Sequence, residues 1–167
     1  VFGEPIPARA GKLAVLQAGE NVRHDEAGDV FLARVAGRVV FAADRLSVEE
    51  TLVIPGDVDL ARGPVDFPGA VIVKGDVRSG LEVHAGKDIE IRGGVEAAKI
   101  ESRGGSVFIR QGVQGAGRAM IVAANDLEAK FIENAVVFAN RRIAIGMSVI
   151  NSEVTAGQEV AVTLRKG

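Results

Sequence analysis

Carboxylates are the side chains best suited to chemistry in this 167-residue chain. Five aspartates gather in one stretch: Asp57, Asp59, Asp66, Asp76 and Asp88. Acidic residues on one outer face of a β-rich protein could hydrolyse a glycosidic bond or bind calcium. Several of these aspartates, however, stand at or near glycine-containing turns, where an Asp side chain can bond the local backbone. Because the chain also has no Trp or Tyr to stack on a sugar, we predict turns here, and no catalytic residue, metal or cofactor.

Nucleophilic catalysis has little support in the composition. The chain has no cysteine, which excludes thiol nucleophiles, disulfides and zinc–thiolate sites. Its two histidines are His24 and His84. His84 alternates with the apolar Val83 and Ala85, so we expect its side chain to point into solvent. We therefore predict that the protein is not an enzyme.

Basic residues recur at one position of a repeat. Lys74, Arg92 and Arg110 each directly follow an apolar-rich triplet, and Lys130 is the nearest counterpart in the next copy. If the triplets are stacked strands, these charges lie about 4.8 Å apart in a column. Nearby glutamates could pair with them and offset their repulsion; these are Glu82, Glu90, Glu101 and Glu128. The column is either a mixed, solvated face or a basic stripe that binds an acidic protein partner.

Phe131 and Glu133 follow the last of these basic residues. Phe131 either fills a corner of the fold or stands outside it as a contact residue. We include both residues with the basic stripe in the predicted partner-binding surface. Nucleic acid is not an expected partner, because the net charge is −2 and the stripe has no interleaved exposed aromatics.

A repeat of about eighteen residues must position these side chains. Its clearest copies cover residues 52–58, 71–77, 89–95 and 107–113, and weaker copies begin at residues 127, 143 and 160. An apolar residue also stands about six positions before each copy, with a turn between, as in the pair Leu46 and Leu52. The longest spacing contains the glycine-rich residues 112–118, which form either a wide turn or an anion-binding loop. Seven short, alternating units of this kind predict a β-solenoid in which each repeat is one coil.

The composition agrees with an all-β fold, since 21 of the 167 residues are glycine and only 4% are aromatic. We predict a parallel β-helix of about seven coils over residues 46–167; the repeat does not show its handedness. Residues 1–45 do not fit the repeat and predict a small N-terminal β meander that caps the first coil, after an extended lead-in at residues 4–7. No apolar run reaches the roughly 18 residues that span a bilayer, and no signal peptide is visible, so we expect a cytoplasmic protein without membrane insertion. Because Val1 is not an initiator, we also expect the natural chain to be longer.

Several segments of the chain carry distinctive motifs: residues 1–8 (VFGEPIPA), 56–60 (GDVDL) running to 65–67 (VDF), 74–80 (KGDVRSG), 129–135 (AKFIENA) and 165–167 (RKG). Together these motifs resemble the flagellar assembly protein A family. Residues 62–64 depart from the family, which has Thr-Gly-Asn where this chain has Arg-Gly-Pro. The resemblance covers nearly the whole chain. It implies a bacterial, cytoplasmic protein with a right-handed β-helix core, linked to flagellar assembly and cell-pole organisation, with no assigned catalytic residues.

Three functions are compatible with such a fold. The preferred one is a non-enzymatic scaffold that binds protein partners through its faces and can also self-associate. A filament that grows end to end would use the same fold with free ends. A carbohydrate-active or acyl-transferring β-helix enzyme is the third, although irregular spacings and the lack of a recurring histidine argue against it.

Overall fold

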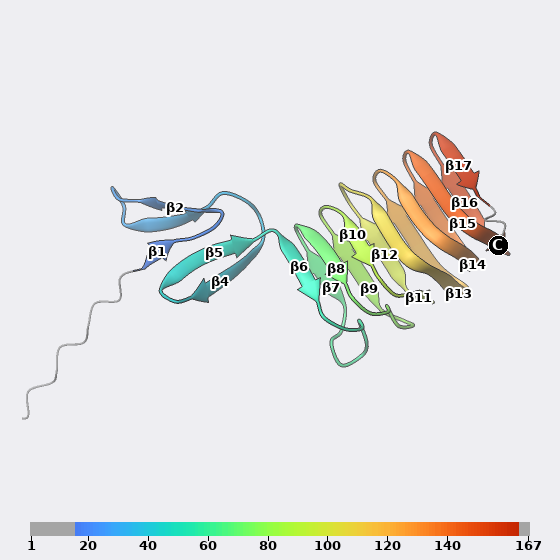
Figure 1. Cartoon of the computed structure of the whole chain (residues 1–167), viewed down its shortest axis with the longest axis horizontal. Helices are drawn as coiled ribbons and strands as arrows, with labels where there is room; N and C mark the ends of the chain where they lie inside the picture. The colour runs from blue at the N-terminus through green and yellow to red at the C-terminus, as the bar shows by residue number, and fades with distance from the viewer. Residues whose placement is uncertain (1–15, 164–167) are drawn as a thin grey trace, which may run out of the picture.

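The computed structural model describes residues 16–163, and every regular element in that range is a β-strand. The strands form a short N-terminal β region followed by a stack of parallel coils (Figure 1). The all-β solenoid predicted from the repeat is therefore confirmed, while its right-handed sense stays a prediction. The lead-in at residues 4–7 and the motifs at residues 1–8 and 165–167 lie outside the described residues.

Two small sheets make up the N-terminal region. The strands β1 (Gln17–Ala18), β5 (Arg45–Glu49) and β4 (Arg38–Ala42) form one sheet, and β2 (Val22–Asp25) pairs with β3 (Val30–Ala33) in an antiparallel hairpin. The described part of the chain shows no pairing between these strands and the coils. Figure 1 shows them beyond one end of the stack, joined to it through β5 and β6. The division at residues 45 and 46 stays a prediction, although β5, which begins at Arg45, pairs with β1 and β4.

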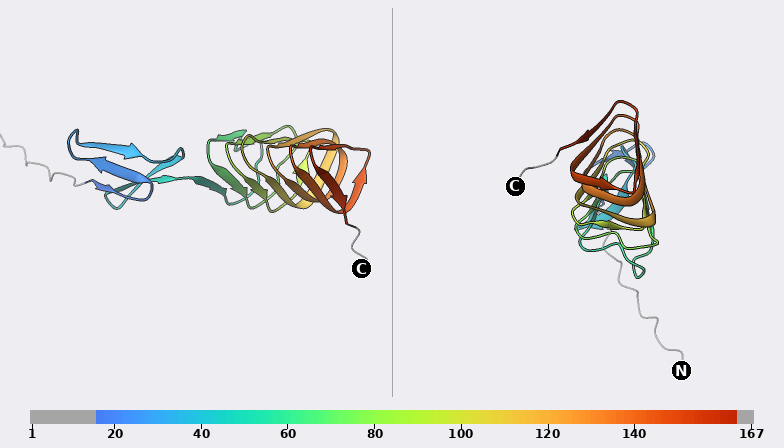
Figure 2. Two further views of the ribbon diagram at one scale, coloured as in Figure 1. Left: turned by 90° about the horizontal axis from the view of Figure 1, so that it is seen from above. Right: turned by 90° about the vertical axis from the view of Figure 1, so that its right-hand side faces the viewer.

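Each coil has three sides, as the view along the stack in Figure 2 shows. Face 1 contains β6 (Thr51–Ile54), β8 (Ala70–Val73), β10 (Ile89–Ile91), the first parts of β13 (Val107–Ala123), β14 (Leu127–Ala139) and β15 (Arg142–Ile150), and β17 (Glu159–Val162). Face 2 contains β11 (Val95–Glu96), the middle parts of β13 and β14, and the last part of β15. Face 3 contains β7 (Val65–Phe67), β9 (Glu82–Ala85), β12 (Lys99–Ser102), the last parts of β13 and β14, and β16 (Glu153–Ala156).

The stack has about six turns rather than the seven units expected. Six of the seven predicted residue pairs join a face 3 strand to the next face 1 strand, for example Val65 to Val71. The first pair does not, because Leu46 lies in β5 and belongs to the N-terminal sheet. The apolar spacing is the same in both places, so periodicity alone could not separate them.

Inward-facing aliphatic side chains stack in columns along the faces and form the core. One column on face 1 is Val71, Ile89, Val107, Leu127 and Ile143, all 0% exposed. Their aligned register follows from strict alternation, which sends every second residue inward. Burying each side chain of this kind contributes roughly 1.5–3 kcal/mol, so the columns hold successive coils together.

A ladder of aspartates joins successive coils at the corner between faces 1 and 2. The Asp57 carboxylate accepts a hydrogen bond from the Asp76 backbone N–H at 2.9 Å, and the Asp76 carboxylate accepts one from Gly94 at 2.8 Å. A Cβ added at Gly75 would lie 2.0 Å from Asp57 Oδ1, and one at Gly93 would lie 2.1 Å from Asp76 Oδ1. The repeated Gly-Asp-Val signature therefore has a physical cause: each aspartate needs a side-chain-free position in the coil above it.

Candidate functional site

The basic residues form the predicted column along one edge of face 1. The residues that precede them, Val73, Ile91, Ile109 and Ala129, are aligned partners on consecutive strands. Lys74, Arg92, Arg110 and Lys130 follow these positions in turn, and all four are exposed. The stacking of the strands thus brings together four cations that are 18 to 20 residues apart in the sequence.

Only part of this column is neutralised by neighbouring acids. Glu90 Oε1 lies 3.5 Å from Arg92 Nε and 3.4 Å from Arg110 Nη2, so one carboxylate serves two guanidinium groups. Lys74 and Lys130 form no ion pair with a described residue. Of the four glutamates expected to pair with the column, only Glu90 does so within residues 16–163. Two of the others, Glu82 and Glu101, lie on face 3 and contact a histidine instead.

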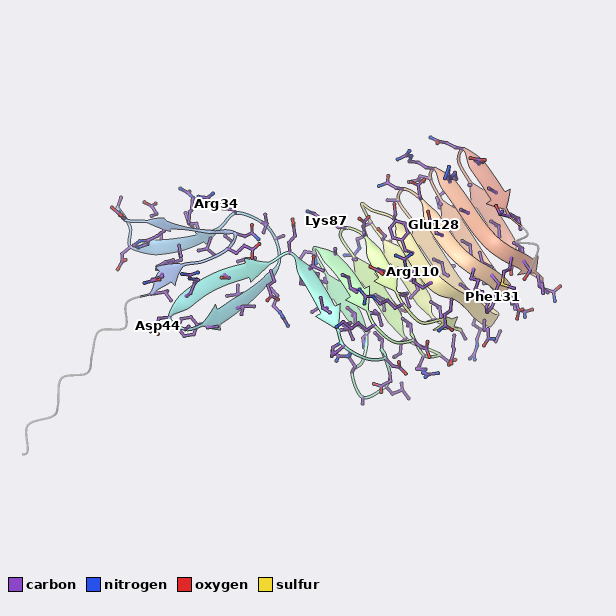
Figure 3. All side chains as sticks on the ribbon, viewed as in Figure 1. Arg34, Asp44, Lys87, Arg110, Glu128 and Phe131 are labelled. Carbon is purple, nitrogen blue, oxygen red and sulfur yellow. The ribbon has the colours of Figure 1, made fainter. Side chains whose placement is uncertain are left out.

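A groove of about 500 Å³ opens at the C-terminal end of the column. Arg110 and Lys130 line it together with the apolar side chains of Phe108 and Met147. The groove exists because Gly146 follows Ile145, the aligned partner of Ala129, and so presents no side chain where the column would continue. Glu128 also lines the groove, and Figure 3 labels it with Arg110 on the stacked coils. The arrangement places two cations beside an apolar floor.

Phe131 and Glu133 lie on face 2, outside this groove. Ile132, between them, takes the inward position and is 0% exposed. The half-buried Phe131 ring covers Gly112 of the preceding coil, where an added Cβ would come within 2.5 Å of the ring. Of the two positions considered for Phe131, the structure therefore shows the outer one. The predicted surface divides into a basic column with a groove on face 1 and a separate pair on face 2.

A protein-family model matches most of the chain. The model described as the Flagellar Assembly Protein A beta solenoid domain covers residues 50–167, from the end of β5 through all the coils. The chain belongs to the flagellar assembly protein A family. Neither the curated proteins nor the solved structures that were searched contain a significant match. Membership relates this solenoid to flagellar assembly.

Two motifs that resemble the flagellar assembly protein A family build corners of the coil. Within residues 74–80, the Arg78 guanidinium lies 2.8 Å from Asp57, 3.1 Å from Asp76 and 2.6 Å from Glu96, which clamps three coils. The backbone N–H of Asp76, and next Arg78, hold the pKa of Asp57 below its ordinary value. Arg78 in turn has a raised pKa, because Asp57 and then Glu96 accept its hydrogen bonds.

The motif at residues 129–135 supplies a residue with left-handed backbone conformation at the corner between faces 2 and 3. In residues 129–135 this residue is Asn134, with φ 49°, and corresponding corners use Gly63, Gly80, Ala97, Gly117 and Asn151. Glycine and asparagine tolerate this backbone conformation best, which explains their recurrence. The glycine-rich residues 112–118 contain the same corner, with positive φ at both Ala116 and Gly117. The structure therefore shows a wide turn there.

A histidine cluster on face 3 was not anticipated from the sequence. His84 points outward as expected, but its side chain is only 13% exposed, because two glutamates flank it. Its Nδ1 lies 2.9 Å from Glu101 Oε2 and its Nε2 lies 2.9 Å from Glu82 Oε2. The contact with His84, and then the charge of Lys99, lower the pKa of Glu82. The repeat could have revealed this contact, because Glu101 occupies the position in the next coil that pairs with His84.

Residues 16–163 hold no group of three or more His, Cys, Asp or Glu side chains arranged to bind a metal ion. The same residues include no helix with the length and apolarity needed to cross a bilayer.

Proposed function

We propose that this solenoid is a non-enzymatic docking scaffold for a protein partner in bacterial flagellar assembly or cell-pole organisation, and that it works in the cytoplasm. The observation that carries the proposal is the groove between Arg110 and Lys130, where fixed cations stand beside exposed apolar surface. A chain segment that combines an acidic residue with an apolar anchor is complementary to it.

The rigidity of the solenoid lowers the cost of binding at this groove. The strands that present Arg110 and Lys130 are fixed by core residues such as Ile109 and Ala129, which are 3% and 6% exposed. A partner that binds therefore orders little of the scaffold, which limits the entropic cost of association. Lys130 forms no ion pair with a described residue, so its ammonium group is available to an acidic group of a partner.

A scaffold accounts for the polar clusters better than an enzyme does. The carboxylates of Asp57 and Asp76 serve as acceptors between coils, and Arg103 pairs with Asp66 at 3.1 Å. His84 stands between two glutamates on an open strand face, and none of the three lines the groove. The groups best suited to acid–base chemistry thus stabilise the fold away from the candidate binding surface.

Site-specific photo-cross-linking in the producing bacterium tests the proposal. We would replace Phe108, which lines the groove, by the photoreactive amino acid p-benzoylphenylalanine, so that one aromatic side chain replaces another. Phe41, 62% exposed in the N-terminal sheet, is the matched control position. The expected result is a discrete cross-linked protein from position 108, identified by mass spectrometry as a flagellar or polar component, and none from position 41.

The charge requirement is tested in the same cells. Combining the photoreactive group at position 108 with Arg110→Glu and Lys130→Glu should abolish the cross-link while the protein level stays unchanged. Reversing Arg141 and Arg142, two exposed arginines that do not line the groove, should leave it intact. Identical cross-linking from the Arg110/Lys130 variant would refute the role of the basic column.

A further inference from the structure

The outward residues of face 3 change from polar to apolar along the stack. In the early coils its outward residues are polar or charged, including Asp66, Glu82 and His84. On β13 and β14 the four outward residues are all apolar: Met120, Val122, Val136 and Phe138. Met120 and Val136 are each 44% exposed, Phe138 is 40% exposed, and Val122 is half-buried. We call these four residues the apolar patch.

Charged and polar residues border the patch on both sides. The strand before it, β12, presents Lys99 and Glu101 outward, and the strand after it, β16, presents Glu153 and Thr155. In register, one row across the face is Lys99, Met120, Val136 and Glu153. A cation therefore stands at one end of this row and an anion at the other.

This order is self-complementary under a two-fold rotation. Consider two copies whose faces 3 are in contact. If the two-fold axis runs parallel to the strands, midway between β13 and β14, the strands of the second copy follow one another in the reverse order. Met120 then faces Val136 of the second copy, and Lys99 faces its Glu153. The same rotation forms the second Lys99–Glu153 contact, because an isologous interface repeats every contact.

We propose that face 3 joins two copies of this chain, through the apolar patch at the centre and two Lys99–Glu153 ion pairs at its borders. Charge complementarity favours a second copy over an unrelated partner, because both required charges lie on this chain at equal distances from the patch. Two flat β faces also pack closely, with their sheets about 10 Å apart. Sheets that pack in this way are rotated by about 30° relative to each other, which separates residues at the borders of the interface. The side chains of Lys99 and Glu153 are long enough to bridge that separation.

The size of the patch sets the expected affinity. Strands spaced about 4.8 Å apart, with residues about 3.3 Å apart along each, give the four central and four bordering residues an area of a few hundred Å² per copy. Interfaces that bury less than about 1,200 Å² in total belong to the weak class. The dimer should therefore assemble in the micromolar range or above and exchange with monomer.

Sedimentation velocity on the 167-residue chain, from about 1 to 500 μM, measures this equilibrium. Val136→Asp should shift the equilibrium to monomer at every concentration, because it buries an unpaired charge at the centre of the patch. Val53→Asp is the matched control, because Val53 is 45% exposed but lies on face 1. This variant should dimerise like wild type. Circular dichroism establishes that both variants are folded.

Charge exchange supplies a second, independent test. Lys99→Glu and Glu153→Lys should each weaken dimerisation by about tenfold, because each places like charges opposite one another. The double variant restores opposite charges and should regain most of the affinity. A chain that stays monomeric at 500 μM would overturn the proposal. So would a dimer that Val136→Asp leaves intact, or single and double charge variants that behave alike.

Discussion

The aspartate ladder predicts that two glycines at the same repeat position respond very differently to one methyl group. Gly56 and Gly75 both precede an aspartate of the ladder. A Cβ at Gly75 would meet Asp57 Oδ1 at 2.0 Å and the Asp57 backbone nitrogen at 2.7 Å, whereas a Cβ at Gly56 meets nothing within 4 Å. The difference arises because Gly56 has no ladder aspartate in a coil before it. Gly75→Ala is the perturbation, and Gly56→Ala is its control.

The expected magnitude follows from the contacts that Gly75→Ala disturbs. The Asp57 carboxylate must move away, which breaks its 2.9 Å hydrogen bond from the Asp76 N–H. A hydrogen bond to a charged group contributes about 1.5–3 kcal/mol, and forcing a methyl group into packed backbone typically costs 1–3 kcal/mol. With partial relaxation we expect the free energy of unfolding to fall by about 2–4 kcal/mol. Gly56→Ala should stay within about 1 kcal/mol of wild type.

Urea unfolding followed by circular dichroism at the β-sheet signal measures both variants. Amide hydrogen exchange adds a local readout, because coils of a solenoid can open separately. The Asp76 amide should exchange faster in Gly75→Ala and at the wild-type rate in Gly56→Ala. Equal stability losses in the two variants, or an unchanged Asp76 exchange rate in Gly75→Ala, would refute the steric role of the ladder.

Three further variants test other contacts. Because the pKa of Asp57 is lowered, its carboxylate stabilises the fold fully above the ordinary Asp pKa, and this stabilisation is lost as the pH falls through the lowered value. In acid titrations, the wild-type free energy of unfolding should therefore lose its advantage over Asp57→Asn below about pH 4. Ser102 is 1% exposed, and its hydroxyl donates to the Lys87 carbonyl at 2.7 Å and accepts from the Gly105 N–H at 2.9 Å. Ser102→Ala should therefore lower the free energy of unfolding by about 1–3 kcal/mol in urea, and a loss below 0.5 kcal/mol would contradict this assignment. Phe131→Ala should cost about 1–2 kcal/mol by uncovering the neighbouring coil, whereas an unchanged urea midpoint would mean that the ring contributes contacts only to a partner.

The repeat predicted most of the solenoid because its signals are local. Alternation identified inward residues such as Ile89 and Val107, and the strand starts it gave are aligned partners in the structure. The basic column followed from the same register. Leu46 fits the apolar spacing of the coils but lies in the N-terminal sheet, because a strand of that sheet has the same alternation as a coil.

The remaining features depend on contacts between coils, which sequence spacing does not display. The ladder aspartates accept hydrogen bonds from the next coil rather than from their own turn. Asp59, which is not part of the ladder, accepts a local hydrogen bond from the Arg62 N–H. The groove needs Gly146 to fall in line with Lys130, across an irregular step in the pairing of β14 with β15. The apolar patch likewise joins Met120 and Val136, which alternation shows only as separate outward residues.

Flagellation of the organism that makes this protein tests the docking account most directly. The native gene would carry Arg110→Glu and Lys130→Glu in one strain and the control changes Arg141→Glu and Arg142→Glu in another. Electron microscopy counts the flagella, and immunoblotting confirms equal protein levels. We expect few or no flagella in the first strain and normal flagella in the second. Normal flagellation with both groove charges reversed would contradict the proposal that this face binds a partner in flagellar assembly.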